Sequence, residues 1–106
     1  MTSSVVDVHA AFLDHARLRK RVDDVLAPVG LSLDMFGLLA SIGTEPRDRG
    51  GLAEELAVPA SELVRAIQPL RKLGWVDRDE EGRILLTVDG SVLLAQARAL
   101  LAEAQR

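Results

Sequence analysis

The feature that most constrains the fold of this chain is a short interruption of its helical hydrophobic period, late in the sequence. Up to Gly74, apolar residues recur at helical spacing, in segments separated by glycine or proline. The runs "WVDR" and "RILLTV" that follow are β-prone and are separated by "DEEG", which predicts a small hairpin. The closing "DGSVLLAQARALLAEAQR" returns to a helical pattern. We therefore expect four helices, a two-stranded hairpin and a last helix, which is a mainly α fold with a small β-hairpin.

The first two predicted helices have clear signals at their ends. The segment from about 5 to 27 contains no glycine or proline, and Pro28 and Gly30 end it. In "LSLDMFGLLASIG", Ser32 is placed to cap the second helix, and Asp34 lies in its first turn, where the helix dipole favours an acid. The apolar face of the first helix is broad, which predicts packing against more than one neighbour, including another subunit.

The later helices are expected to follow tight turns. "GGLAEELAV" predicts a short third helix. Pro59 is well placed at the start of a fourth helix, which runs from about 60 to 73. The last helix has two candidate caps, Asp89 and Ser91.

Length and composition exclude several classes of protein. At 106 residues the chain is long enough for one core only, so we expect 1–106 to form a single domain. The absence of cysteine excludes disulfides, thiolate metal sites and thiol redox switches. No apolar run approaches the roughly 18 residues of a membrane span, and the N-terminus lacks a signal-peptide pattern. We therefore expect a soluble, cytoplasmic protein that has no membrane partner.

The sequence contains no recognisable catalytic or metal-binding arrangement. His9 and His15 are six positions apart and do not share a helix face. The acids show no paired-carboxylate spacing, and no nucleophile is matched with a base. We therefore expect a protein that is not an enzyme and has neither a metal site nor a cofactor.

The charge of the chain is distributed unevenly. The net charge of −3 produces no overall attraction to nucleic acid. Only the segment 59–76 has a net positive charge, because three bases in it are set against the single acid Glu62. This segment is the predicted fourth helix, so a nucleic-acid contact, if the chain makes one, is expected there.

Four stretches, in order, resemble the MarR family of bacterial transcription regulators. "LSLDMFGLL" is similar to the family's second helix and "GLAEELAV" to its third. "SELVRAIQPLRKLGWV" resembles its recognition helix, including a Pro-Leu step, and "LLTVDGSVLL" resembles the end of its wing. The likeness runs from about Leu31 to Leu94. It implies a winged helix-turn-helix over 31–88, flanked by dimerisation helices in 1–30 and 89–106.

The resemblance also implies a function, which is sequence-specific binding of double-stranded DNA by a homodimeric transcription regulator. The helix of about 60–73 is then expected to enter the major groove. Family members often bind small aromatic effectors, although no residue of this chain specifies such a ligand. The residues expected to face bases are Ser61, Glu62, Val64 and Arg65, and those expected to approach phosphates are Arg71, Lys72, Arg78 and Arg83.

Some features depart from the family pattern and keep a second interpretation open. The wing is short and carries Asp79, Glu80 and Glu81 in place of the family's Asp-x-Arg pair, and Glu62 stands where hydroxyl residues are common. The family's second C-terminal helix is missing from this sequence, so dimerisation is expected to rest on the first and last helices. The alternative is a protein-interaction module, a partner or antagonist of another regulator, with weak or no DNA binding. In that case Arg65 pairs with Glu62, and Arg83 only neutralises Glu80 and Glu81.

Overall fold

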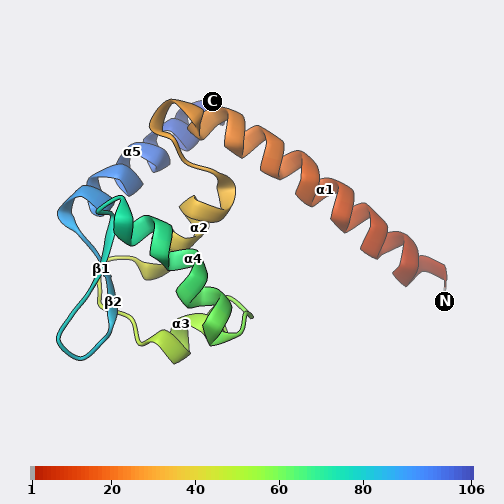
Figure 1. The fold of residues 1–106 in the computed structure, drawn as a ribbon. Helices are drawn as coiled ribbons and strands as arrows, with labels where there is room; N and C mark the ends of the chain where they lie inside the picture. The colour runs from red at the N-terminus through yellow and green to blue at the C-terminus, as the bar shows by residue number, and fades with distance from the viewer. Residues whose placement is uncertain (1) are drawn as a thin grey trace.

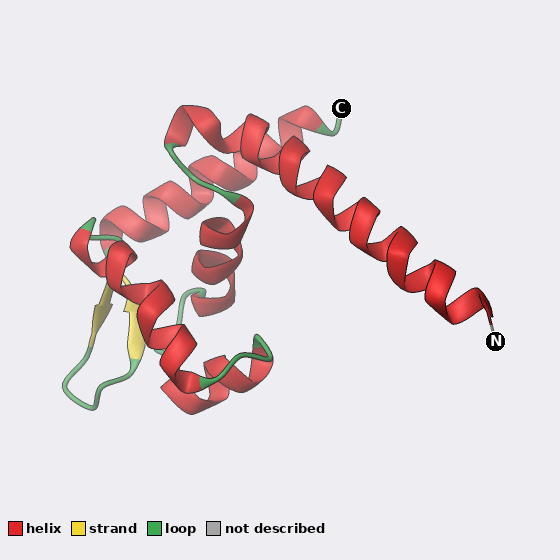
Figure 2. Cartoon of the chain, turned by 45° about the vertical axis from the view of Figure 1, so that its right-hand side comes forward, coloured by secondary structure: helices red, strands yellow, loops and turns green. Residues whose placement is uncertain are grey.

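The predicted order of elements is confirmed. The structure is a computed structural model that describes residues 2–106, with side chains from residue 7 onward. The helices and strands follow one another as in Figures 1 and 2. The elements are α1 (Thr2–Leu26), the short 3-10 helix η1 (Ala27–Val29), α2 (Leu33–Ile42), α3 (Arg49–Glu55), α4 (Ala60–Lys72), β1 (Val76–Arg78), β2 (Ile84–Leu86) and α5 (Val88–Ala104).

The predicted signals between α1 and α2 act as expected. The chain leaves η1 through Gly30, whose φ of 74° lies in the left-handed region that glycine tolerates best. The Ser32 hydroxyl then accepts a hydrogen bond from the Met35 amide at 3.2 Å and caps α2.

Two side chains of α1 also hold the first turn of α2. The Asp23 carboxylate accepts a hydrogen bond from the Leu33 amide at 2.7 Å, across ten positions of sequence. Arg19 donates to the Asp34 carboxylate at 2.9 Å. The hydrogen bond from Arg19 holds the pKa of Asp34 below its ordinary value. The α1–α2 joint is therefore fastened by polar contacts as well as by the core.

The predicted caps of the last helix are wrong. Helix α5 begins at Val88, and its cap is Thr87, whose hydroxyl accepts a hydrogen bond from the Gly90 amide at 3.0 Å. The same hydroxyl donates to the Gly74 carbonyl at 2.6 Å. This contact with the end of α4 fixes Thr87 at the cap. Asp89 lies in the first turn instead, where its charge suits the helix dipole.

The wing consists of β1, β2 and the loop between them. The strands are antiparallel, and Asp77 pairs with Leu85 at the centre of the ladder. The free edge of β2 is paired with the loop before α3, because Arg47 and Ile84 exchange two backbone hydrogen bonds of 2.7 and 2.8 Å. The sequence did not predict this second pairing. It attaches the wing to the helix-turn-helix on the side away from α4.

A single aliphatic core holds the domain together. Every α-helix and both strands contribute at least one buried apolar residue, and no polar side chain in the described part of the chain is buried. The N-terminal half of α1 projects away from this core (Figures 1 and 2). Val8 and Phe12 there are 71% and 67% exposed. Only part of the broad apolar face predicted for the first helix is therefore buried within one chain.

The helices differ from membrane spans in length and composition. Within 7–106, no single helix is long and apolar enough to cross a membrane. Helices α1 and α2 reach the length and composition of a membrane span only when they are taken together as a bent pair.

Candidate nucleic-acid interface

Helix α4 presents two opposite faces. Leu63, Ile67 and Leu70 are buried at spacings of four and three, and they pack this helix on the core. On the opposite side lie Ser61, Arg65, Gln68 and Lys72, all exposed and spaced by four, three and four. We call these four residues the outer line of α4. The helix thus carries hydroxyl, amide and cationic groups along its whole exposed length.

The residues predicted to face bases occupy different parts of this surface. Ser61 and Arg65 lie on the outer line, and Glu62 is exposed beside it. Val64 is half-buried, at the border with the core face. Arg65 forms no ion pair with Glu62 or with any other residue from 7 onward. Its guanidinium is therefore not occupied by a neighbouring carboxylate.

Gln68 is the outer-line residue that the sequence analysis missed. It is exposed, and its side-chain amide forms no hydrogen bond within the described part of the chain. Its spacing of three from Arg65 was a signal that could have found it.

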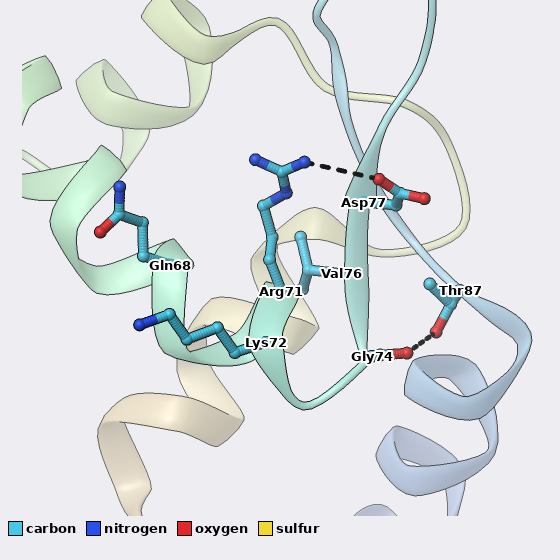
Figure 3. A pocket seen from close by; sticks show the side chains of 7 residues that line it. All are labelled: Gln68, Arg71, Lys72, Gly74, Val76, Asp77 and Thr87. Carbon is cyan, nitrogen blue, oxygen red and sulfur yellow. Dashed lines mark hydrogen bonds and ion pairs between the residues drawn. The ribbon is translucent and has the colours of Figure 1, made fainter.

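A cavity of about 430 Å³ lies between the C-terminal half of α4 and the wing (Figure 3). Across it, the Arg71 guanidinium is 3.8 Å from the Asp77 carboxylate of β1. Gln68 and Lys72 line the same cavity, and their side chains extend away from Asp77 (Figure 3). The lining residues are Gln68, Arg71, Lys72, Gly74, Val76, Asp77 and Thr87.

At the tip of the wing, Asp79 closes the loop. Its carboxylate accepts hydrogen bonds from the backbone amides of Glu81 at 3.0 Å and Arg83 at 2.8 Å. It also accepts one from Arg83 Nε at 2.7 Å. Partial burial acts to raise the pKa of Asp79, but the backbone and side-chain hydrogen bonds from Arg83 outweigh it and lower the pKa. Asp79 thus holds the loop together through its negative charge.

The remaining groups of the wing differ in how they are paired. Arg83 also contacts Glu81 at 2.6 Å, so its guanidinium lies between two carboxylates, those of Asp79 and Glu81. The expectation that Arg83 neutralises Glu80 and Glu81 is therefore half right, because the first partner is Asp79. Arg78 and Glu80 are exposed and form no ion pair within 7–106.

The charge balance of the whole surface follows from these pairs. Helix α4 and the wing contain five bases and five acids. Ion pairs engage three of the acids but only two of the bases. Within 7–106, the bases without an ion pair are Arg65, Lys72 and Arg78, and the acids without one are Glu62 and Glu80. Across the described residues, no group of three or more His, Asp or Glu side chains is arranged to hold a metal ion.

Comparison with solved structures identifies matches to this fold. The sequence by itself matches no protein-family model and no curated protein. The structure of the transcriptional regulator MosR of M. tuberculosis in complex with DNA is 26% identical, with a TM-score of 0.80, and the match covers 92% of this chain and 79% of MosR. CouR of Rhodococcus jostii RHA1, bound to p-coumaroyl-CoA, is 22% identical with a TM-score of 0.78 over 91% of this chain and 72% of CouR. The oxidised form of MarR from E. coli is 21% identical with a TM-score of 0.82 over 91% of this chain and 74% of MarR.

Proposed function

Since this chain has the winged helix-turn-helix fold of the MarR-family transcription regulators, we propose that it binds double-stranded DNA sequence-specifically and regulates transcription as a homodimer. The observation that carries this proposal is the outer line of α4. A helix that enters the major groove must present polar side chains along the face opposite its core contacts. Ser61, Arg65, Gln68 and Lys72 do so, and neither Arg65 nor Lys72 is engaged in an ion pair within 7–106.

The proposed contacts follow from the position and pairing of each group. Arg65 is placed near the centre of the helix, and it is proposed to donate to guanine O6 and N7. Ser61 and Glu62 lie in the first turn, where Glu62 can accept from cytosine N4. Val64 has only part of its side chain available for a base contact.

The phosphate contacts are proposed to be unequal. Lys72 and Arg78 are exposed and unpaired, so they approach the DNA backbone at the lowest cost. Arg71 and Arg83 must first loosen their ion pairs with acids of the wing. The wing is therefore proposed to contribute less affinity than α4, with Arg78 as its main contact.

The homodimer is proposed to form through α1 and α5. The projecting half of α1 exposes Val8 and Phe12, and a cavity of about 410 Å³ lies between α1 and α5. A second copy of the chain that covers these surfaces would remove apolar area from water. Two recognition helices related in this way would reach half-sites about one helical turn of DNA apart.

A further cavity, of about 540 Å³, is proposed to receive the small-molecule effector. It lies between α1, α2 and α4, and Glu62 and Leu63 of α4 form part of its wall. The likeness to CouR, which was solved with p-coumaroyl-CoA, supports a ligand-responsive regulator. A ligand in this cavity would contact the helix proposed to read DNA.

The competing proposal, a protein-interaction module, is favoured by a different observation. Glu62 and Glu80 are exposed and unpaired on the same surface, where they would repel phosphates. In that case the chain binds another regulator, and it binds DNA weakly or not at all.

Binding of the purified protein to duplex DNA between about 50 and 200 mM salt distinguishes the two proposals. DNA that includes the upstream region of its own gene and a random pool are suitable probes. We expect affinity to fall steeply with salt, because each phosphate contact adds about −0.9 to the slope of log K against log salt. An absence of binding at the lowest salt would reject DNA binding and favour the interaction module.

Arg65→Ala tests the proposed base contact. Loss of a bidentate guanine contact should weaken binding to the selected site by about 1–3 kcal/mol and relax the preference at one position. Arg98→Ala is the matched control, since Arg98 is exposed on α5, belongs neither to α4 nor to the wing, and does not line the cavity between α1 and α5. Equal affinities of the Arg65 and Arg98 variants would remove Arg65 from the interface.

A further inference from the structure

Gln68 differs from its neighbours in the kind of contact that it can make. The side-chain amide carries an acceptor oxygen and a donor nitrogen, whereas the lysine and arginine side chains around it only donate. Phosphate oxygens only accept, so they attract cations more strongly than an amide. An amide on a surface that faces DNA is better matched to a partner that presents both a donor and an acceptor.

The surroundings of Gln68 leave its amide available. It is exposed, and no hydrogen bond within the described residues engages its side chain. The guanidinium of Arg71, which lines the same cavity, is directed towards Asp77 (Figure 3). Pro69 follows directly and lies inside α4 as well. Gln68 is therefore unoccupied and is carried by α4.

We infer that Gln68 is a base-reading residue that recognises adenine in the major groove, through hydrogen bonds to adenine N6 and N7. Adenine presents a donor and an acceptor at this edge, which match the two ends of the glutamine amide. The inference rests on the proposed function, because it requires that α4 enters the groove. It adds to that function the identity of a second base in each half-site.

The position of Gln68 on α4 sets where this base should lie. Gln68 is three residues beyond Arg65, which corresponds to about 4.5 Å along the helix axis. Successive base pairs are about 3.4 Å apart on each strand. The adenine read by Gln68 should therefore lie one or two base pairs from the guanine read by Arg65. Lys72, one turn further along α4, would reach the backbone beyond them.

The test is selection of binding sites from random duplex DNA by the wild-type protein and three variants. Gln68→Ala should lose the preference for adenine at one position of each half-site, and its affinity for the wild-type site should fall about 5- to 150-fold per half-site. Gln68→Glu should move that preference towards cytosine, which a carboxylate can accept from. The salt dependence should not change, because no phosphate contact is removed.

Gln96→Ala is the matched control, because Gln96 is exposed on α5. It should select the same sites as the wild type. Thermal unfolding of the Gln68 variants should match that of the wild type, since the side chain contributes nothing to the core. This comparison separates a loss of base reading from a loss of fold.

The outcomes separate this inference from the function on which it rests. If the wild type and Gln68→Ala select the same sequence with the same affinity, the role of Gln68 is wrong and the regulator proposal remains. If the wild type selects no sequence, both are wrong. A change in salt slope with an unchanged sequence preference would make Gln68 a backbone contact and would also overturn the inference.

Discussion

Single residues of this chain have roles that their chemical type alone does not reveal. Asp79, Glu80 and Glu81 form an acidic run, which predicts a wing that repels DNA. Asp79 is instead the acceptor that closes the loop, and Arg83 balances both it and Glu81. Of these three acids, only Glu80 is exposed and without an ion pair within 7–106. The repulsion expected from the wing is correspondingly smaller.

Gly90 occupies a position at which the fold leaves no room for a side chain. A Cβ at this position would clash with the carbonyl oxygen of Trp75 and lie 2.9 Å from its carbonyl carbon. Backbone atoms cannot rotate away as a side chain can, so we expect Gly90→Ala to lower the free energy of unfolding by about 1–3 kcal/mol or more. Urea denaturation followed by circular dichroism measures the change.

Gly37→Ala is the control for Gly90→Ala. Gly37 lies within α2, and a Cβ there meets nothing within 4 Å. Because alanine is the better helix former, this variant should be stabilised by about 0.5–1 kcal/mol. A Gly90→Ala protein as stable as the wild type would contradict the tight packing of α5 against the start of the wing.

At the scale of helices and strands, most of the sequence-based prediction is confirmed. The ends of α1 and α2 are marked by Pro28, Gly30 and Ser32, whose effects reach only a few residues along the chain. The cap of α5 was wrong, because Thr87 is selected by the Gly74 carbonyl. Local signals therefore predict an element well until a distant group binds one of its terminal residues.

The joint between α1 and α2 provides a test at this scale. Asp23→Ala removes the carboxylate that accepts from the Leu33 amide at 2.7 Å, and it leaves that amide without its capping partner. By analogy with the loss of a helix N-cap, we expect the free energy of unfolding to fall by about 0.5–2 kcal/mol. Urea denaturation at neutral pH is the appropriate measurement.

Asp24→Ala is the neighbouring control. Asp24 contacts only Lys20, at 3.2 Å, and the two side chains are 69% and 79% exposed. Exposed pairs of this kind contribute little, so this variant should unfold close to the wild type. Equal destabilisation by the two substitutions would show that Asp23 acts through charge in general and not as a cap.

The molecule as a whole combines a packed body with a projecting helix. The core joins all elements, yet the N-terminal half of α1 leaves it and exposes apolar side chains (Figure 1). The proposed homodimer uses this helix as its contact. Within one chain, the Arg19–Asp34 and Asp23–Leu33 contacts hold the start of α2 against α1.

Val8→Glu tests the proposed dimer. Val8 is 71% exposed on the projecting half of α1, and a carboxylate there would have to be desolvated on association. We expect this variant to sediment as a monomer at concentrations where the wild type is a dimer. Its helical content should be unchanged.

Val88→Glu makes the same substitution at a valine that is 80% exposed in the first turn of α5. The α5 residues that line the cavity proposed for the dimer, Leu101 and Ala104, lie at the other end of this helix. It should remain dimeric. A wild-type protein that is monomeric at all concentrations, or a Val8→Glu variant that dimerises as the wild type does, would reject the α1 contact.

The sequence by itself determined the order of elements, the approximate limits of each helix and the winged helix-turn-helix class. The order and limits depend on the hydrophobic period and on glycine, proline and capping residues, which act over a few positions, whereas the class follows from the resemblance of four stretches to the MarR family. Only the tertiary structure decided that Thr87 caps α5, that Asp23 binds the start of α2 and that Arg47 pairs with Ile84. It also decided which charges of the proposed interface remain unpaired. The physical reason is that each of these contacts joins groups far apart in the sequence, or depends on the exact course of a loop, so its partner is known only once the chain has folded.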